Sequence, residues 1–155
     1  MPEQKTLKRA RQDKRAGKSA STQSGEFVRE EIHHIREGKH GARSAKQAIA
    51  IGLSKARRAG VKLPAPPPSA KASTKRSAAA ATRAAKRGGT RPSPKRSRAM
   101  TRKLKREPRR AASHEALSRQ ATAAAKRRTR KERSASARKA ARTRKRTQRR
   151  SATSR

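Results

Sequence analysis

Histidines and glutamates lie close together in the first third of the chain, and these residue types can bind a metal ion or act as acids and bases. They are His33, His34 and His40 with Glu30, Glu31 and Glu37. On a helix His33 and His34 point about 100° apart, and His40 lies beyond a turn, so they make no ready chelate. His114 is isolated. We therefore expect no metal, no cofactor and no catalysis, and the protein is not expected to be an enzyme.

Phosphate neutralisation by lysine and arginine is the stronger chemical signal. The chain has 48 basic and 9 acidic residues and a formal charge of +39. Aromatic residues for base stacking are nearly absent, which favours a duplex over a single strand, and duplex DNA is preferred over RNA. The residues expected to bind nucleic acid are Lys55, Arg57, Arg58, Lys95, Arg96, Arg98, Arg102, Lys103, Lys105, Arg106, Lys126, Arg127, Arg128, Arg130, Lys131, Arg138, Lys139, Arg142, Arg144, Lys145 and Arg146.

One short motif could bind DNA more specifically. Ser93-Pro94-Lys95-Arg96 follows Arg91-Pro92 and is similar to the Ser-Pro-basic-basic turns of linker-histone tails. In such tails a compact turn presents two cations to a narrow minor groove. A plain Ser-Pro turn explains the same residues, and this is the interpretation that we prefer.

Composition limits how much of the chain can fold. Its 155 residues include one Phe and no Trp, Tyr or Cys. After Leu63 the sizeable apolar residues are Met100, Leu104 and Leu117. Low hydrophobicity with high net charge is typical of disorder, so we expect a mostly disordered chain with a small all-α helical hairpin. We see no secretory signal and no apolar run long enough to cross a membrane.

Residues 44–60 carry the clearest helix signals. Ser44 and Gln47 have capping-box spacing, and Gly60 can end the helix in a left-handed conformation with Val61 folded back on Ala56. A preceding helix is predicted to begin after Ser24 and to end at Gly38. Gly52 lies in the apolar stripe, which indicates close approach of the first helix. The predicted hairpin core is Phe27, Val28, Ile32, Ile35, Ile49, Gly52, Leu53 and Ala56.

The second helix of this hairpin could also be the recognition helix of a helix-turn-helix. Lys46 and Gln47 would then be presented early in that helix. The preceding helix is acidic, and we expect no third helix to brace the pair. We prefer a hairpin that serves as an oligomerisation or protein-docking module, because two short helices are marginally stable by themselves.

Four segments follow from these patterns. Residues 1–24 are expected to be a basic flexible arm, 25–63 the helical hairpin, 64–70 a proline-rich linker and 71–155 an Ala/Lys/Arg-rich basic tail. In the tail like charges repel, so helices at Pro94–Glu107 and His114–Lys131 should be fractional until phosphate neutralises them. Ser113 is the predicted N-cap of the second of these.

The segment GEFVREEIHHIREGKHGARSAKQAIAIGLSKARRAG, residues 25–60, resembles a family of small, basic bacterial proteins of unassigned function with a KQAIAIGLSKARRAG-type helix. The resemblance implies a bacterial setting and a shared helical module, and it implies no catalytic residue. Residues 64–155 resemble bacterial linker-histone-like proteins in composition only.

These patterns lead us to expect a non-enzymatic, largely sequence-independent DNA-binding protein that is histone-like and nucleoid-associated. Its localisation would be cytoplasmic, at the nucleoid, with no membrane or small-molecule partner. The hairpin could form a homo-oligomer or bind a protein partner. The alternatives are an RNA-binding or ribosome-associated factor, and a regulatory adaptor whose hairpin docks a protein partner.

Overall fold

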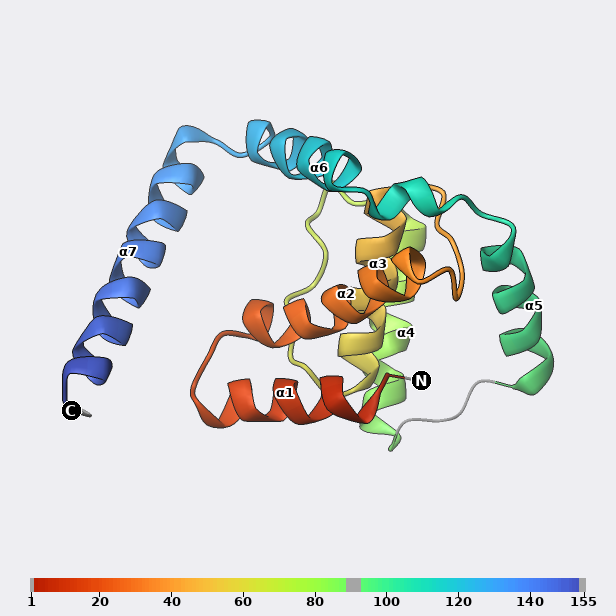
Figure 1. The fold of residues 1–155 in the computed structure, drawn as a ribbon, viewed down its shortest axis with the longest axis horizontal. Helices are drawn as coiled ribbons and strands as arrows, with labels where there is room; N and C mark the ends of the chain where they lie inside the picture. The colour runs from red at the N-terminus through yellow and green to blue at the C-terminus, as the bar shows by residue number, and fades with distance from the viewer. Residues whose placement is uncertain (1, 89–92, 154–155) are drawn as a thin grey trace. The chain divides into compact units, whose positions relative to one another are not determined.

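The computed structural model describes residues 2–88 and 93–153, and over these residues the protein is all-α (Figure 1). The helices are α1 (Gln4–Arg15), α2 (Ala20–Arg36), α3 (Ala45–Arg58), α4 (Ala72–Lys86), α5 (Pro94–Lys105), the 3-10 helix η1 (Arg109–Ala112), α6 (His114–Lys126) and α7 (Arg130–Thr153). The prediction of a mostly disordered chain is therefore wrong. Alanine, lysine and arginine are strong helix formers, and this local preference outweighs the repulsion between like charges.

The chain divides into two compact units, Met1–Leu117 and Ser118–Arg155. The first unit contains α1 to α5, η1 and the start of α6. The second contains the rest of α6 and all of α7. The proline-rich linker expected at residues 64–70 thus lies inside the first unit.

The α2–α3 hairpin forms as its local signals predict. The Ser44 hydroxyl accepts the Gln47 N–H at 3.3 Å, and Gly60 has a φ of +86°. The Val61 N–H donates to the Ala56 carbonyl at 3.1 Å, which completes the predicted helix end. A Cβ at Gly52 would lie 2.7 Å from Val28 Cα, so the close approach of the two helices is confirmed.

The N-terminal segment differs from the predicted flexible arm. Ser19, rather than Ser24, caps α2 by accepting the Thr22 N–H, and α1 packs against α2 (Figure 1). Ala10 of α1 is buried with Phe27 and Ala56 in one cluster of the core. The partly buried residues around this cluster are Leu7, Val61 and Leu63. One modest apolar stripe on α1 is thus enough to cover the end of the hairpin.

The expected hairpin core is divided between two clusters. Phe27, Ile32, Ile35, Gly52 and Ala56 are buried. The partly exposed members of the predicted core are Val28, Ile49 and Leu53. A second cluster joins Ile32 and Ile35 to the alanines 42, 48, 111 and 112, with Val28 and Leu117 against it.

The basic tail supplies part of that second cluster, which the disorder prediction missed. The Gly41 N–H donates to the Leu104 carbonyl at 2.9 Å, and the Ala42 N–H donates to the Pro108 carbonyl at 3.1 Å. Ala111 and Ala112 of η1 are 4% and 0% exposed. Burial of these small side chains and satisfied backbone groups fix residues 104–112 on the hairpin.

Other parts of the tail form helices for local and packing reasons. On α4, which packs against α3, Ala78 and Ala81 are buried. The predicted N-cap Ser113 accepts the Ala116 N–H at 3.1 Å and begins α6. Before α7, Thr129 and Glu132 cap each other: the Thr129 N–H donates to Glu132 Oε2 at 2.8 Å and the Glu132 N–H to Thr129 Oγ1 at 3.2 Å.

Candidate nucleic-acid interface

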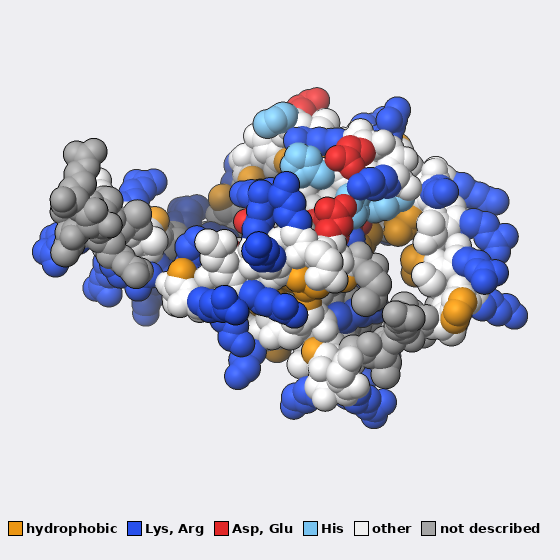
Figure 2. Space-filling view, turned by 60° about the horizontal axis from the view of Figure 1, so that its bottom comes forward, with side chains coloured by type: hydrophobic (Ala, Val, Ile, Leu, Met, Phe, Trp, Pro, Cys, Tyr) orange, Lys and Arg blue, Asp and Glu red, His pale blue; other side chains and the backbone are white. Residues whose placement is uncertain are grey.

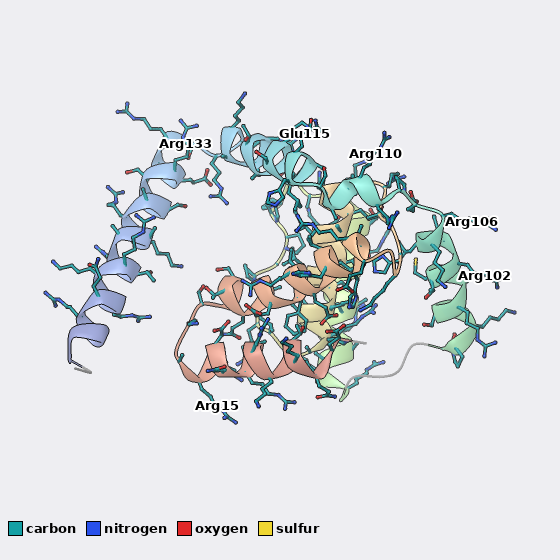
Figure 3. All side chains as sticks on the ribbon, viewed as in Figure 1. Arg15, Arg102, Arg106, Arg110, Glu115 and Arg133 are labelled. Carbon is teal, nitrogen blue, oxygen red and sulfur yellow. The ribbon has the colours of Figure 1, made fainter. Side chains whose placement is uncertain are left out.

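Helix α5 carries a row of exposed cations. Six of its twelve residues are Lys or Arg and none is acidic. Lys95, Arg98, Arg102 and Lys105 recur every three or four residues, so they lie along one side of the helix. Figure 3 labels Arg102 and, just beyond the helix, Arg106, which are both exposed. Lys103 is exposed as well.

The structure changes the expected Ser-Pro turn. Pro94 is the first residue of α5, and the Ser97 N–H donates to the Ser93 carbonyl at 2.9 Å, so the motif begins a helix. Lys95 is therefore presented from a helical first turn. Arg91, Pro92 and the side chain of Arg96 lie outside the described part of the structure.

Helix α7 is the longest described helix and is strongly basic. Eleven of its 24 residues are Lys or Arg, against one Glu. We define the basic face of α7 as Lys131, Arg138, Arg142, Lys145 and Arg149, which helical periodicity places along one side. All five are exposed. The other residues of this region that were expected to bind nucleic acid are exposed as well. They are Arg130, Lys139, Arg144 and Arg146 on the helix and Lys126, Arg127 and Arg128 before it.

The three basic residues of α3 that were expected to bind nucleic acid do not form one exposed cluster. Lys55 is turned inward: its Nζ lies 3.1 Å from Glu30 Oε1 and 2.7 Å from Glu31 Oε2. Arg57 donates to the Pro64 carbonyl at 2.9 Å. Of the three, Arg58 is exposed. Lys55 is thus committed to an internal charge cluster instead of a phosphate.

The helix-turn-helix alternative loses one of its two candidate recognition residues, Gln47, whereas Lys46 is exposed. Gln47 Oε1 accepts the Arg43 N–H at 2.9 Å, so this side chain caps α3. Both α1 and α4 pack against the α2–α3 pair, so the pair is not the unbraced hairpin that we expected.

The sequence analysis missed basic residues on two other helices. Lys8, Arg11 and Arg15 are exposed on the side of α1 away from Ala10, and Figure 3 shows Arg15 at the end of that helix. On α4 the exposed cations are Lys75, Arg76, Arg83 and Lys86. The Leu7–Ala10 spacing could have indicated which side of α1 faces the core.

Acidic groups are gathered rather than scattered among the cations. Figure 2 shows acidic and histidine side chains close together on one part of the surface, with lysine and arginine around them. Burial alone would raise the pKa of Glu30, but hydrogen bonds from Thr6, the Glu3 backbone N–H and Lys55 outweigh it and lower the pKa. This carboxylate therefore stays charged and neutralises Lys55 locally.

No helix in the described part of the chain is long and apolar enough to cross a membrane. The model of a family of unknown function (DUF6496) matches residues 7–66, which extend from α1 to just beyond α3. A search of curated proteins and a search of solved structures each gave no match. The match is consistent with the resemblance to a family of unassigned function, and it includes most of α1.

Proposed function

We propose that the protein is a non-enzymatic, largely sequence-independent DNA-binding protein of the histone-like, nucleoid-associated kind. The observation that carries this proposal is α7, where 11 of 24 residues are basic and one is acidic, and every side chain whose exposure is described is exposed. At 1.5 Å per residue this helix is about 36 Å long, close to one turn of duplex DNA. A rod of cations of this length can follow the phosphates of a duplex.

The distribution of acidic residues supports the same function. Six of the nine acidic residues precede residue 38, and Glu30 and Glu31 are paired with Lys55. The described cations of α5 and α7 lie at exposed positions, where an external polyanion can reach them. Bound phosphates would release counterions, which gives affinity without base contacts.

Helix formation before binding also favours binding to a duplex. An ordered basic helix loses less conformational entropy on a duplex than a disordered tail does. Proteins that bind single strands usually stack bases on exposed aromatic side chains. The one aromatic residue of this chain, a Phe, is 1% exposed, which argues against a single-stranded partner. We therefore retain duplex DNA as the preferred partner.

Crosslinking in cells followed by sequencing of the bound nucleic acid tests the proposal. We expect DNA from positions spread along the chromosome, with no short consensus sequence. Recovery of mainly ribosomal or messenger RNA would overturn the DNA proposal in favour of the RNA-binding alternative. A single enriched DNA motif would instead contradict sequence-independent binding.

A further inference from the structure

Two histidines and a buried glutamate meet where α2 turns into α3. One ligand atom each of Glu31, His34 and His40 lies within 4.8 Å of the other two. Glu31 and His34 are one turn apart on α2, and the loop after α2 returns His40 to them, so that the two imidazole rings make an edge contact at 6.2 Å. The sequence analysis rejected this group because it placed His40 beyond a turn.

Glu31 has an unusual environment for a charged group. Its side chain is 0% exposed, and neither carboxylate oxygen accepts a hydrogen bond from the described residues. The Lys55 ammonium lies 2.7 Å from Oε2 and His40 Nε2 lies 3.3 Å from Oε1, without hydrogen-bond geometry in either contact. The Lys55 ammonium offsets part of the cost of burying this carboxylate, and its oxygens keep lone pairs that can coordinate a further cation.

The tautomer of His40 sharpens the argument. Its Nδ1 lies 3.0 Å from the Gly41 carbonyl oxygen, which can only accept, so Nδ1 carries a proton. In the neutral ring Nε2 then has a lone pair, and this lone pair faces Glu31 Oε1. A proton on Nε2, or a metal ion bound by both atoms, would relieve the repulsion between these two acceptors. Their 3.3 Å separation agrees with the edge of a zinc tetrahedron, which is about 3.3 Å for bonds of about 2.0–2.1 Å.

The charges around this group also leave room for a divalent cation. Glu30 and Glu31 share the ammonium of Lys55, and Glu3 Oε1 lies 2.7 Å from His34 Nε2. Lys39 lies closer to Glu37, at 3.0 Å, than to Glu3, at 3.5 Å. With neutral histidines, three carboxylates and one ammonium carry two excess negative charges.

We propose that Glu31, His34 and His40 form a structural zinc site that joins α2 to the α2–α3 loop. Imidazole and carboxylate donors suit Zn²⁺. Lys55 Nζ lies 2.7 Å from the Glu31 carboxylate and orients it from α3, and Glu3 Oε1 accepts a hydrogen bond from His34 Nε2 at 2.7 Å, which orients that imidazole. A metal held this way ties the α2–α3 loop to α2 and stabilises the first unit. This proposal does not depend on nucleic-acid binding.

The test uses the full-length chain, freed of nucleic acid and metal. Co²⁺ is the spectroscopic probe, and Zn²⁺ is then titrated against it. We expect one Co²⁺ per chain with the intense visible bands of a tetrahedral site, displaced by one Zn²⁺. His34→Gln and His40→Gln should each weaken Zn²⁺ binding by at least about tenfold. His33→Gln is the matched control, because His33 is exposed on the same helix, and it should bind as the wild type does.

Thermal unfolding gives a second readout. Zn²⁺ should raise the Tm of the wild type and of His33→Gln, but not of His40→Gln. Absence of tetrahedral Co²⁺ bands in the wild-type chain would overturn the proposal by itself, whether or not the variants fold. An equal loss of Zn²⁺ affinity in His33→Gln and His40→Gln would overturn it too.

Discussion

The backbone N–H of Gly41 donates a hydrogen bond to the carbonyl oxygen of Leu104 at 2.9 Å. This contact joins the loop between α2 and α3 to the last turn of α5, far along the sequence. Glu107 approaches so closely that a Cβ at position 41 would overlap its backbone carbonyl. The basic tail therefore contains part of the fold, and removal of everything after residue 63 would expose the core beside Ile35.

Gly41→Ala should destabilise the protein strongly. The added methyl group meets the Glu107 backbone, which cannot give way as a flexible side chain can, and we expect a loss of about 1–3 kcal/mol in the free energy of unfolding. Gly25→Ala is the matched control. Gly25 lies inside α2 with open space around it, so alanine there should raise the free energy of unfolding by about 0.5–1 kcal/mol. Urea unfolding compares the two, and equal stabilities would contradict the packing of residues 104–108.

Gly52→Ala tests the contact between α2 and α3. Alanine favours the helical conformation by about 1 kcal/mol, but its Cβ would lie 2.7 Å from Val28 Cα. We expect the clash to exceed the helix preference and to destabilise the protein by about 1–3 kcal/mol. A stabilised Gly52→Ala in thermal or urea unfolding would show that the helices are farther apart.

Lys55→Met should affect stability more than DNA affinity. It leaves the buried Glu31 and Glu30 carboxylates without their ammonium, at a cost of about 3 kcal/mol. Arg58→Met removes the same charge from an exposed position of α3 and should be nearly neutral for stability. Unfolding and DNA binding are measured for both. Equal stability of the two variants would contradict the inward placement of Lys55.

Acid should weaken the start of α7 through Glu132. The Thr129 backbone N–H, followed by its hydroxyl, lowers the pKa of Glu132 from the usual 4.5. Because the pKa of Glu132 is lower in the folded helix, the stabilisation from the cap is complete above about pH 4.5. It is lost as the pH falls through the pKa of the folded state. An NMR titration should therefore give a pKa below 4.5 for Glu132, and Thr129→Val should raise it. An unchanged pKa of Glu132 in that variant would contradict the contribution of the Thr129 hydroxyl to the cap.

Two triple variants test the basic face of α7 at equal charge. The basic-face variant is Arg138→Gln/Arg142→Gln/Lys145→Gln, and its control is Arg130→Gln/Arg133→Gln/Arg144→Gln. If the basic face contacts phosphates, the first variant should reduce the slope of log K against log salt by about 3, at about one per lost contact. The control variant should reduce this slope by less than half as much. Equal losses, with helix content unchanged by circular dichroism, would contradict a preferred face.

The features that the sequence predicted correctly depend on neighbouring residues. Ser44 and Gln47 cap α3, Gly60 and Val61 end it, and Gly52 marks a close helix contact. Each signal lies within a few residues of the structure that it determines. Such local signals predict helix ends and contacts even in a chain with little apolar content.

The features that the sequence analysis missed depend on distant residues. Ala111 and Ala112 are small, so their burial beside Ile35 leaves no periodic pattern of large apolar groups. The bond from Gly41 to Leu104 joins two backbones and carries no side-chain signal. Lys55 was expected at a phosphate because the sequence does not show that Glu31 is buried beside it. The grouping of His40 with His34 likewise depends on the path of a loop.

The most direct measurement of the central claim is binding of the full-length chain to matched duplex DNA and duplex RNA over a series of salt concentrations. With about ten phosphates contacted, affinity for DNA should fall by about 10³–10⁵ between about 50 and 200 mM salt. At every salt concentration DNA should bind more tightly than RNA. Failure to bind duplex DNA at physiological ionic strength, or tighter binding to RNA, would contradict the account.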